Sequence, residues 1–326
     1  MKKSIFVFLL ILIGTSAGYA QEKDTVKVGV FITSLYDMSL PDNSFKADFW
    51  LWFNYTNDRL DMLESVEIIN AKEVDKQIPS TEKKNGINWS TQKYQVVLKK
   101  QWNIEHFPFD RQNLEIFFEE AVADTSAIYL IADKKNSRLA EQVRIQGWKI
   151  TSFDIVNGVS LYHTTYGDPV LSGESAYGHI KVQIRMQRSG IGLFLKLFIG
   201  VYIAFAISLL VYFIEPIQID SRVGLSVGSL FAAVGNKYIV DSILPETINF
   251  TLVDKVHLLT FFLIFIALTV SVVSFYLEKG EKLRLAKRWD FVAFSISLIL
   301  YIIFNAWLLY QAYYSEAEAF MYGNKF

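Results

Sequence analysis

The sequence predicts an all-β sandwich domain followed by an all-α bundle of four membrane-spanning helices. Two observations carry this prediction. Short alternating runs rich in Val, Ile and aromatic residues fill the first part of the chain, and four apolar stretches fill the second part. The composition changes from polar to apolar near residue 190, which places the two domains at 21–190 and 191–326.

The composition already excludes several classes of protein. The chain has 326 residues, 32 basic and 33 acidic, and its 52% hydrophobic and 20% charged residues disfavour a disordered or wholly soluble protein. No long basic run is present, so nucleic acid is not an expected partner. The absence of Cys excludes disulfides and Cys-zinc sites. The four His residues form no metal motif, so we expect no metal and no cofactor.

The first 20 residues read as a secretory signal peptide. Lys2 and Lys3 precede an apolar run over 5–13, and Ala20 ends a stretch of small residues. A run this short does not cross a hydrocarbon core about 30 Å thick. We therefore expect cleavage after Ala20 and a mature chain that begins outside the cytoplasmic membrane.

The β domain is predicted from six alternating runs separated by turn signals such as Asn85-Gly86. Many short strands with regular turns are typical of a sandwich or barrel. The runs are Val26–Leu35, Ala47–Tyr55, Tyr94–Leu98, Leu114–Phe118, Gly147–Ile155 and His179–Met186.

The four helices are predicted at about 191–214, 221–244, 254–277 and 289–311, each long enough to span a bilayer. The loop 278–290 carries five basic residues and the opposite loop 245–255 carries one. Positive charge marks the cytoplasmic side, so the β domain and the C-terminus are expected outside. The second helix is the most polar, and it should face water or protein.

One face of the second helix has the composition of a pore lining. Steps of the helical period from Asp220 give a carboxylate at the cytoplasmic end, small residues, one Phe and a polar outer end. A ring of carboxylates favours cations, and an apolar ring can gate by dewetting. The face consists of Asp220, Gly224, Gly228, Phe231, Gly235, Tyr238 and Ser242. Spacing alone leaves an alternative open, in which Gly224, Gly228 and Ala232 form a helix-packing face.

An enzyme is not expected. Residues 224–228 spell G-x-S-x-G, and an intramembrane protease could pair Ser226 with His257. These two residues should lie near opposite ends of their helices, which disfavours that reading.

The strongest motif is Trp102–Phe118, with the core Phe107-Pro108-Phe109-Asp110-x-Gln112. It resembles the signature loop of pentameric ligand-gated ion channels, the Cys-loop receptor family, in its Cys-free prokaryotic form. Further similar segments follow in the family's order, so the resemblance covers nearly the whole mature chain. They are Val30–Asp37, Asn54–Leu60, Gly147-Trp148, Met186–Arg188 and Arg222–Leu225, with Pro245 at the end of the pore helix.

The resemblance implies a homopentamer in the bacterial cytoplasmic membrane, with a periplasmic β domain and the second helix facing the axis. It implies a small-molecule agonist or protons as the stimulus, permeating monovalent cations, and membrane lipids as further partners. A coupling junction is implied between the two domains. Its residues would be Phe107, Pro108, Phe109, Asp110, Arg188 and Pro245.

The family pattern is incomplete at the agonist site, because 64–89 lacks the expected Trp-x-Pro segment. Aromatic rings can hold a cation, and the candidate ligand residues are Trp50, Tyr162, His163, Tyr166 and Tyr177. Titratable residues resembling proton sensors are Asp37, Asp42, Glu105 and His106. Asp220-Ser221 favours cation selectivity, whereas the following Arg222-Val-Gly-Leu is common in anion channels. Lys237 and the three glycines of the pore face keep a non-conducting membrane sensor as an alternative.

Overall fold

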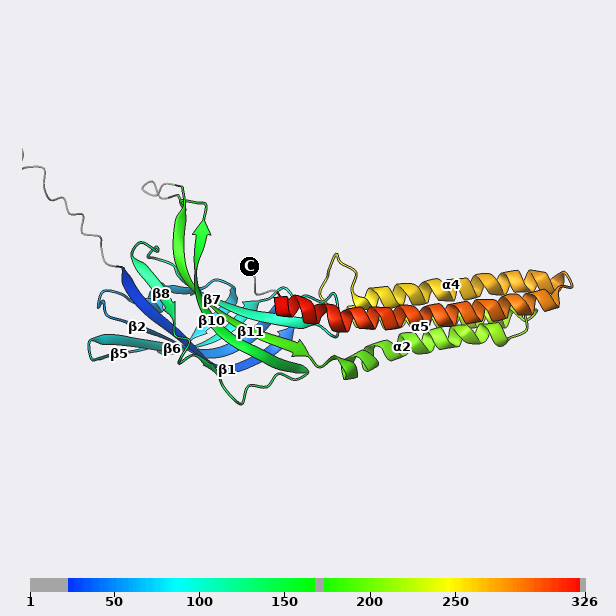
Figure 1. Cartoon of the computed structure of the whole chain (residues 1–326), viewed down its shortest axis with the longest axis horizontal. Coiled ribbons are helices and arrows are strands. Elements are labelled where there is room, and N and C mark those ends of the chain that lie inside the picture. Colours follow the sequence, from blue (N-terminus) through cyan, green and yellow to red (C-terminus); the bar gives the residue numbers. More distant parts are fainter. Residues whose placement is uncertain (1–22, 168–172, 323–326) are drawn as a thin grey trace, which may run out of the picture.

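The computed structural model describes residues 23–167 and 173–322. A β domain lies at one end of the elongated molecule and long helices extend from it side by side (Figure 1). The predicted signal peptide lies outside the described residues. The predicted fold class, a sheet-rich N-terminal domain followed by four apolar helices, is confirmed.

Two sheets form the β domain. The first has the order β4-β6-β2-β1-β8, with β5 on β6 and β9 on β1, and the second has the order β10-β11-β7-β3. The strands of the first sheet are β1 (Asp24–Ser39), β2 (Ser44–Tyr55), β4 (Ala71–Lys76), β5 (Ser80–Lys84), β6 (Ile87–Lys99), β8 (Ile128–Ala132) and β9 (Arg138–Leu139). Those of the second are β3 (Val66–Ile68), β7 (Arg111–Glu120), β10 (Trp148–Tyr162) and β11 (Ser175–Arg188); the short helix α1 (Met62–Ser65) precedes β3.

The core of the β domain lies between the sheets, where the apolar members of each alternating run point. Phe49 of β2 stacks on Tyr94 of β6 at 5.5 Å between ring centroids, and its ring meets Phe118 of β7 edge-on at 5.4 Å. These rings join the two sheets. The predicted runs lie in β1, β2, β6, β7, β10 and β11, with Gly147 just before β10. Strands β4 and β5 escaped prediction because their residues are nearly all exposed and show no apolar alternation.

Four helices follow: α2 (Gly190–Leu210), extended by the 3₁₀ turn η1 (Val211–Phe213), then α3 (Ile219–Asp241), α4 (Leu252–Lys279) and α5 (Leu283–Tyr322). All four are long and apolar enough to cross a membrane. Helix α5 ends beside the β domain, so the chain leaves that domain along α2 and comes back to it along α5 (Figure 1).

The segment 278–290 differs from the expected loop, because only 280–282 lies outside the helices α4 and α5. The charged residues Arg284, Lys287 and Arg288 belong to α5, which begins at Leu283 rather than near 289. Hydropathy marks the apolar part of a helix, whereas Lys and Arg are good helix formers that extend it beyond the membrane.

Candidate functional site: the exposed face of α3 and its contacts

The face of α3 singled out by helical spacing is not covered by the rest of the subunit. All seven residues of that face are exposed, Phe231 to 72% and Tyr238 to 78%. A Cβ atom added at Gly224, Gly228 or Gly235 would meet no atom within 4 Å. Within the described residues these glycines therefore do not serve close packing inside one subunit. The side of α3 buried against the bundle consists of Arg222, Ser226, Ser229, Ala233 and Val240.

A buried ion pair, which sequence reasoning missed, holds the N-terminal end of α3. Arg222 is fully buried and bonds Asp290 of α5 through two hydrogen bonds, the shorter 2.7 Å. The guanidinium also donates to the Ile214 carbonyl, and Ser274 of α4 donates to Asp290. Such a buried pair is costly to break. It fixes the base of α3 beside Asp220, while Asp220 itself stays exposed.

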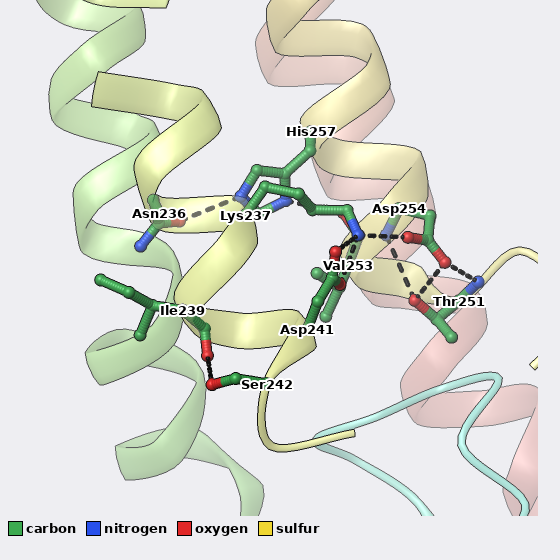
Figure 2. Close-up of polar contacts among 9 residues, drawn as sticks. All are labelled: Asn236, Lys237, Ile239, Asp241, Ser242, Thr251, Val253, Asp254 and His257. Atoms are coloured by element: carbon green, nitrogen blue, oxygen red, sulfur yellow. Dashed lines mark hydrogen bonds and ion pairs between the residues drawn. The ribbon is translucent and has the colours of Figure 1, made fainter. Parts of the chain in front are cut away.

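A polar cluster joins the C-terminal end of α3 to α4 (Figure 2). Lys237 forms ion pairs with Asp241 one turn along α3 and with Asp254 of α4, the latter at 2.8 Å. The carboxylate of Asp254 also accepts hydrogen bonds from the backbone N–H and hydroxyl of Thr251, which closes a capping box at the start of α4. Lys237 is therefore a neutralised link between helices and not a cation of the exposed face.

The protease alternative is wrong. The hydroxyl of Ser226 donates to the Arg222 carbonyl within α3, whereas the His257 ring contacts the Val253 carbonyl and Asn236. A serine nucleophile needs a histidine within hydrogen-bond reach, and these two side chains have other partners.

The junction between the domains is built on the Asp110–Arg188 pair. Asp110 is fully buried, and its two carboxylate oxygens accept bonds of 2.6 and 3.2 Å from Arg188. Gln112 donates to the same carboxylate at 2.8 Å. The guanidinium lies 3.9 Å from the Trp148 ring centroid and 4.9 Å from that of Phe107. Charge-assisted bonds and ring contacts together fix this side chain.

The signature loop contacts the starts of two helices. A Cβ atom at Gly190 would clash with the Pro108 carbonyl oxygen, so Pro108 packs directly against the first residue of α2. The backbone N–H of Leu252, at the start of α4, donates to the Glu105 carbonyl at 2.8 Å. Pro245 lines a cavity of about 260 Å³ together with Ile104 and Lys237. Ile104 and Glu105 of the signature loop thus meet the segment 245–254.

Three of the five candidate ligand residues converge and two do not. Tyr162, Tyr166 and Tyr177 line a pocket of about 420 Å³, with Tyr162 about 6 Å from both other rings. Trp50 lies in β2 of the other sheet and is 40% exposed. His163 pairs instead with Glu174 at 2.8 Å. The distance between the sheets, which the sequence does not reveal, separates Trp50 from the tyrosines within one subunit.

Glu119 of β7 supplies a carboxylate to the same pocket, and sequence reasoning missed it. Its side chain is 7% exposed, and it accepts a 2.6 Å bond from the Tyr162 hydroxyl, which raises the pKa of Tyr162 to about 12. Among the described residues, nothing bonds the second oxygen of Glu119. A buried carboxylate with one unpaired oxygen, among aromatic rings, favours a cation.

The four candidate proton sensors are dispersed. Asp37 pairs with Lys46 at 2.7 Å, and Asp42 accepts a 2.6 Å bond from Ser39 in the β1–β2 turn. Glu105 lies 3.8 Å from Lys255 at the domain junction. Burial lowers the pKa of the neighbouring His106, only partly offset by the Glu105 charge. These residues form no single cluster within the described chain.

The fold and site describe a membrane protein whose β domain is joined by a buried ion pair to four helices, one of them with an uncovered polar face. The chain is similar to the proton-gated ion channel of Gloeobacter violaceus, with 22% identity over 315 residues that cover 89% of this chain and 85% of that protein. No family model matches the chain. The similarity supports the resemblance carried by the signature loop, and it confirms the expectation that the chain is not an enzyme.

Proposed function

We propose that the chain is the subunit of a homopentameric, ligand- or proton-gated, cation-selective channel of a bacterial cytoplasmic membrane. The observation that carries the proposal is the uncovered face of α3, where a Cβ atom added at any of the three glycines would meet no other part of the subunit within 4 Å. Copies of this face around an axis would form a water-filled path with Asp220 at its cytoplasmic end. The β domain would lie in the periplasm, and lipids would surround the outer helix faces.

The decisive experiment is a recording from purified protein in a planar bilayer, scanned across pH and cationic amines. Gated currents are expected, since a stimulus shifts a closed–open equilibrium through its differential affinity for the two states. Stimulus binding without current at any pH would favour the non-conducting sensor. Two features favoured the sensor, the Lys237 charge and the three glycines of the pore face. The first no longer favours it, because carboxylates neutralise the Lys237 charge.

Phe231→Ala is expected to raise the current that flows without a stimulus. Phe231 is the one large apolar side chain on the exposed face and the natural ring at which the pore dewets. Leu230→Ala, one residue away and off that face, is the matched control and should stay tight. A Phe231→Ala channel with no added resting current would show that the gate lies elsewhere.

The pocket of Tyr162, Tyr166 and Tyr177 is the proposed agonist site, and the buried Glu119 carboxylate makes a cationic amine the expected ligand. Glu119→Gln should raise the amine concentration for half-activation about 10- to 100-fold, because a hydrogen bond to a charged group contributes about 1.5–3 kcal/mol. Glu174→Gln, which alters only the exposed partner of His163, is the control. Equal sensitivity of the two variants would remove Glu119 from the site.

A further inference from the structure

His257 is buried between three helices, with a polar atom against each ring nitrogen. The residue lies on α4 and is 1% exposed. Its Nδ1 is 2.8 Å from the carbonyl oxygen of Val253, and its Nε2 is 3.0 Å from Oδ1 of Asn236 on α3 (Figure 2). Rings of Phe198 from α2 and Phe261 from α4 lie about 6 Å away. Both ring nitrogens of His257 thus face oxygen acceptors, and aromatic rings lie beside the imidazole.

The orientation of Asn236 is set from the opposite side. Its Nδ2 donates to the Leu197 carbonyl of α2 at 3.1 Å. Because a carbonyl only accepts, the amide nitrogen must face Leu197 and the amide oxygen must face His257. Gly200 makes this arrangement possible, since a Cβ atom there would lie 2.8 Å from the Asn236 Nδ2.

A neutral imidazole has one donor and one acceptor nitrogen, so it cannot bond two acceptors at once. Only the imidazolium donates to both Val253 and Asn236. We infer that His257 is a proton-binding site, and that the packing of α2, α3 and α4 described here is the packing of the protonated histidine. This site differs from the four residues that the sequence indicated as proton sensors.

The surrounding charges favour the same state. The charged groups near the ring are Lys237 and Asp241 from α3 and Asp254 from α4, which sum to one negative charge. The aromatic Phe198 faces the ring from α2. A proton on His257 makes the cluster electrically neutral, which lowers the cost of holding an imidazolium out of water.

Loss of the proton removes one of three contacts: His257–Val253 within α4, His257–Asn236 between α4 and α3, or Asn236–Leu197 between α3 and α2. Loss of either contact of Asn236 frees the outer half of α3 from a neighbouring helix. This packing binds the proton more tightly than one in which Asn236 has moved away, so acid favours the packing and rising pH disfavours it. A consequence for gating rests on the proposed channel function; the proton site itself does not.

The test is nitrogen NMR of the full chain in lipid vesicles with ¹⁵N-labelled histidine, over pH 4–9. The His257 signal is assigned as the one lost in His257→Gln, and both its ring nitrogens are expected to carry protons in the acid range. Asn236→Leu removes one acceptor and should move the titration midpoint down by about one to two pH units. Gly200→Ala should move it in the same direction by displacing Asn236.

His179 provides an internal control, because its Nδ1 lies 2.9 Å from the Ser160 hydroxyl, which can donate or accept. Its titration should be identical in all variants. Where His257→Gln does not fold, Gln variants of the other three histidines, His106, His163 and His179, assign their own signals, and the signal that remains belongs to His257. A His257 signal with one bare nitrogen across the whole pH range, or one indifferent to Asn236→Leu, overturns the inference. None of these NMR measurements depends on ion current, so the two proposals can fail separately. A protein that conducts while His257 stays neutral would refute this inference alone. A protein that holds His257 as an imidazolium but never conducts would refute only the channel function.

Discussion

Arg188→Ala is expected to give a subunit that assembles but does not open. The substitution leaves the carboxylate of Asp110, which is fully buried, without its charged partner. Removing one member of a buried pair costs about 3–5 kcal/mol. The lost side chain is also the one that ties the last strand before the membrane, β11, to the signature loop. Chemical cross-linking would measure assembly, and bilayer recordings would measure activation.

Two further variants separate coupling from stability. Arg188→Lys keeps the positive charge but cannot form the bidentate hydrogen bonds of the guanidinium, so the variant should fold well and open weakly. The double variant Asp110→Asn with Arg188→Ala should be less destabilised than the sum of its single variants, because no charge is left stranded. Ordinary activation of Arg188→Ala, in correctly assembled protein, would leave the pair a structural role only.

Asp220→Asn is expected to abolish much of the preference for cations. Asp220 is exposed at the inner end of the proposed pore face, and a ring of five such carboxylates would concentrate cations there. An ideally cation-selective pore reverses at about 59 mV in a tenfold gradient of a monovalent salt. The variant should reverse much closer to zero.

Glu215→Gln is the matched control for this measurement, since Glu215 is an exposed carboxylate just before α3 and outside the proposed face. Its reversal potential should equal that of the unaltered protein. An unchanged potential in Asp220→Asn would argue against the carboxylate ring, and a reversal of opposite sign in the unaltered protein would make the channel anion-selective.

The junction between the domains shows how much of a tertiary contact a local sequence motif can predict. Asp110 and Arg188 are 78 positions apart in the chain, and only the family resemblance placed them in one junction. The structure adds contacts that the motif does not reveal, namely those of the Trp148 and Phe107 rings with the guanidinium and that of Glu105 with α4. These contacts join segments that are far apart in the chain, and the order of the segments does not reveal which of them lie close together in the fold.

In the ligand pocket, sequence reasoning predicted only some of the residues that come together. The tyrosines were selected as aromatics near one hairpin, and three converge because β10 and β11 pair in register, with Tyr162 opposite Ser175. His163 was selected with the tyrosines and pairs instead with Glu174, whereas Trp50 was selected because it resembles an aromatic position of the family, and it lies in the other sheet. Glu119 was not selected, because a carboxylate at the end of a strand looks like any solvated charge until its burial is known.

The sequence by itself determined the order of the domains, the four apolar helices and which residues share one face of α3. These features depend on hydropathy and on periods of two and 3.6 residues, which are local properties of the chain. Only the tertiary structure decided that Arg222 meets Asp290, that Lys237 is shared between two helices, and that both nitrogens of His257 face acceptors. Each of these depends on side chains brought together from different helices, and burial then makes their hydrogen bonds obligatory.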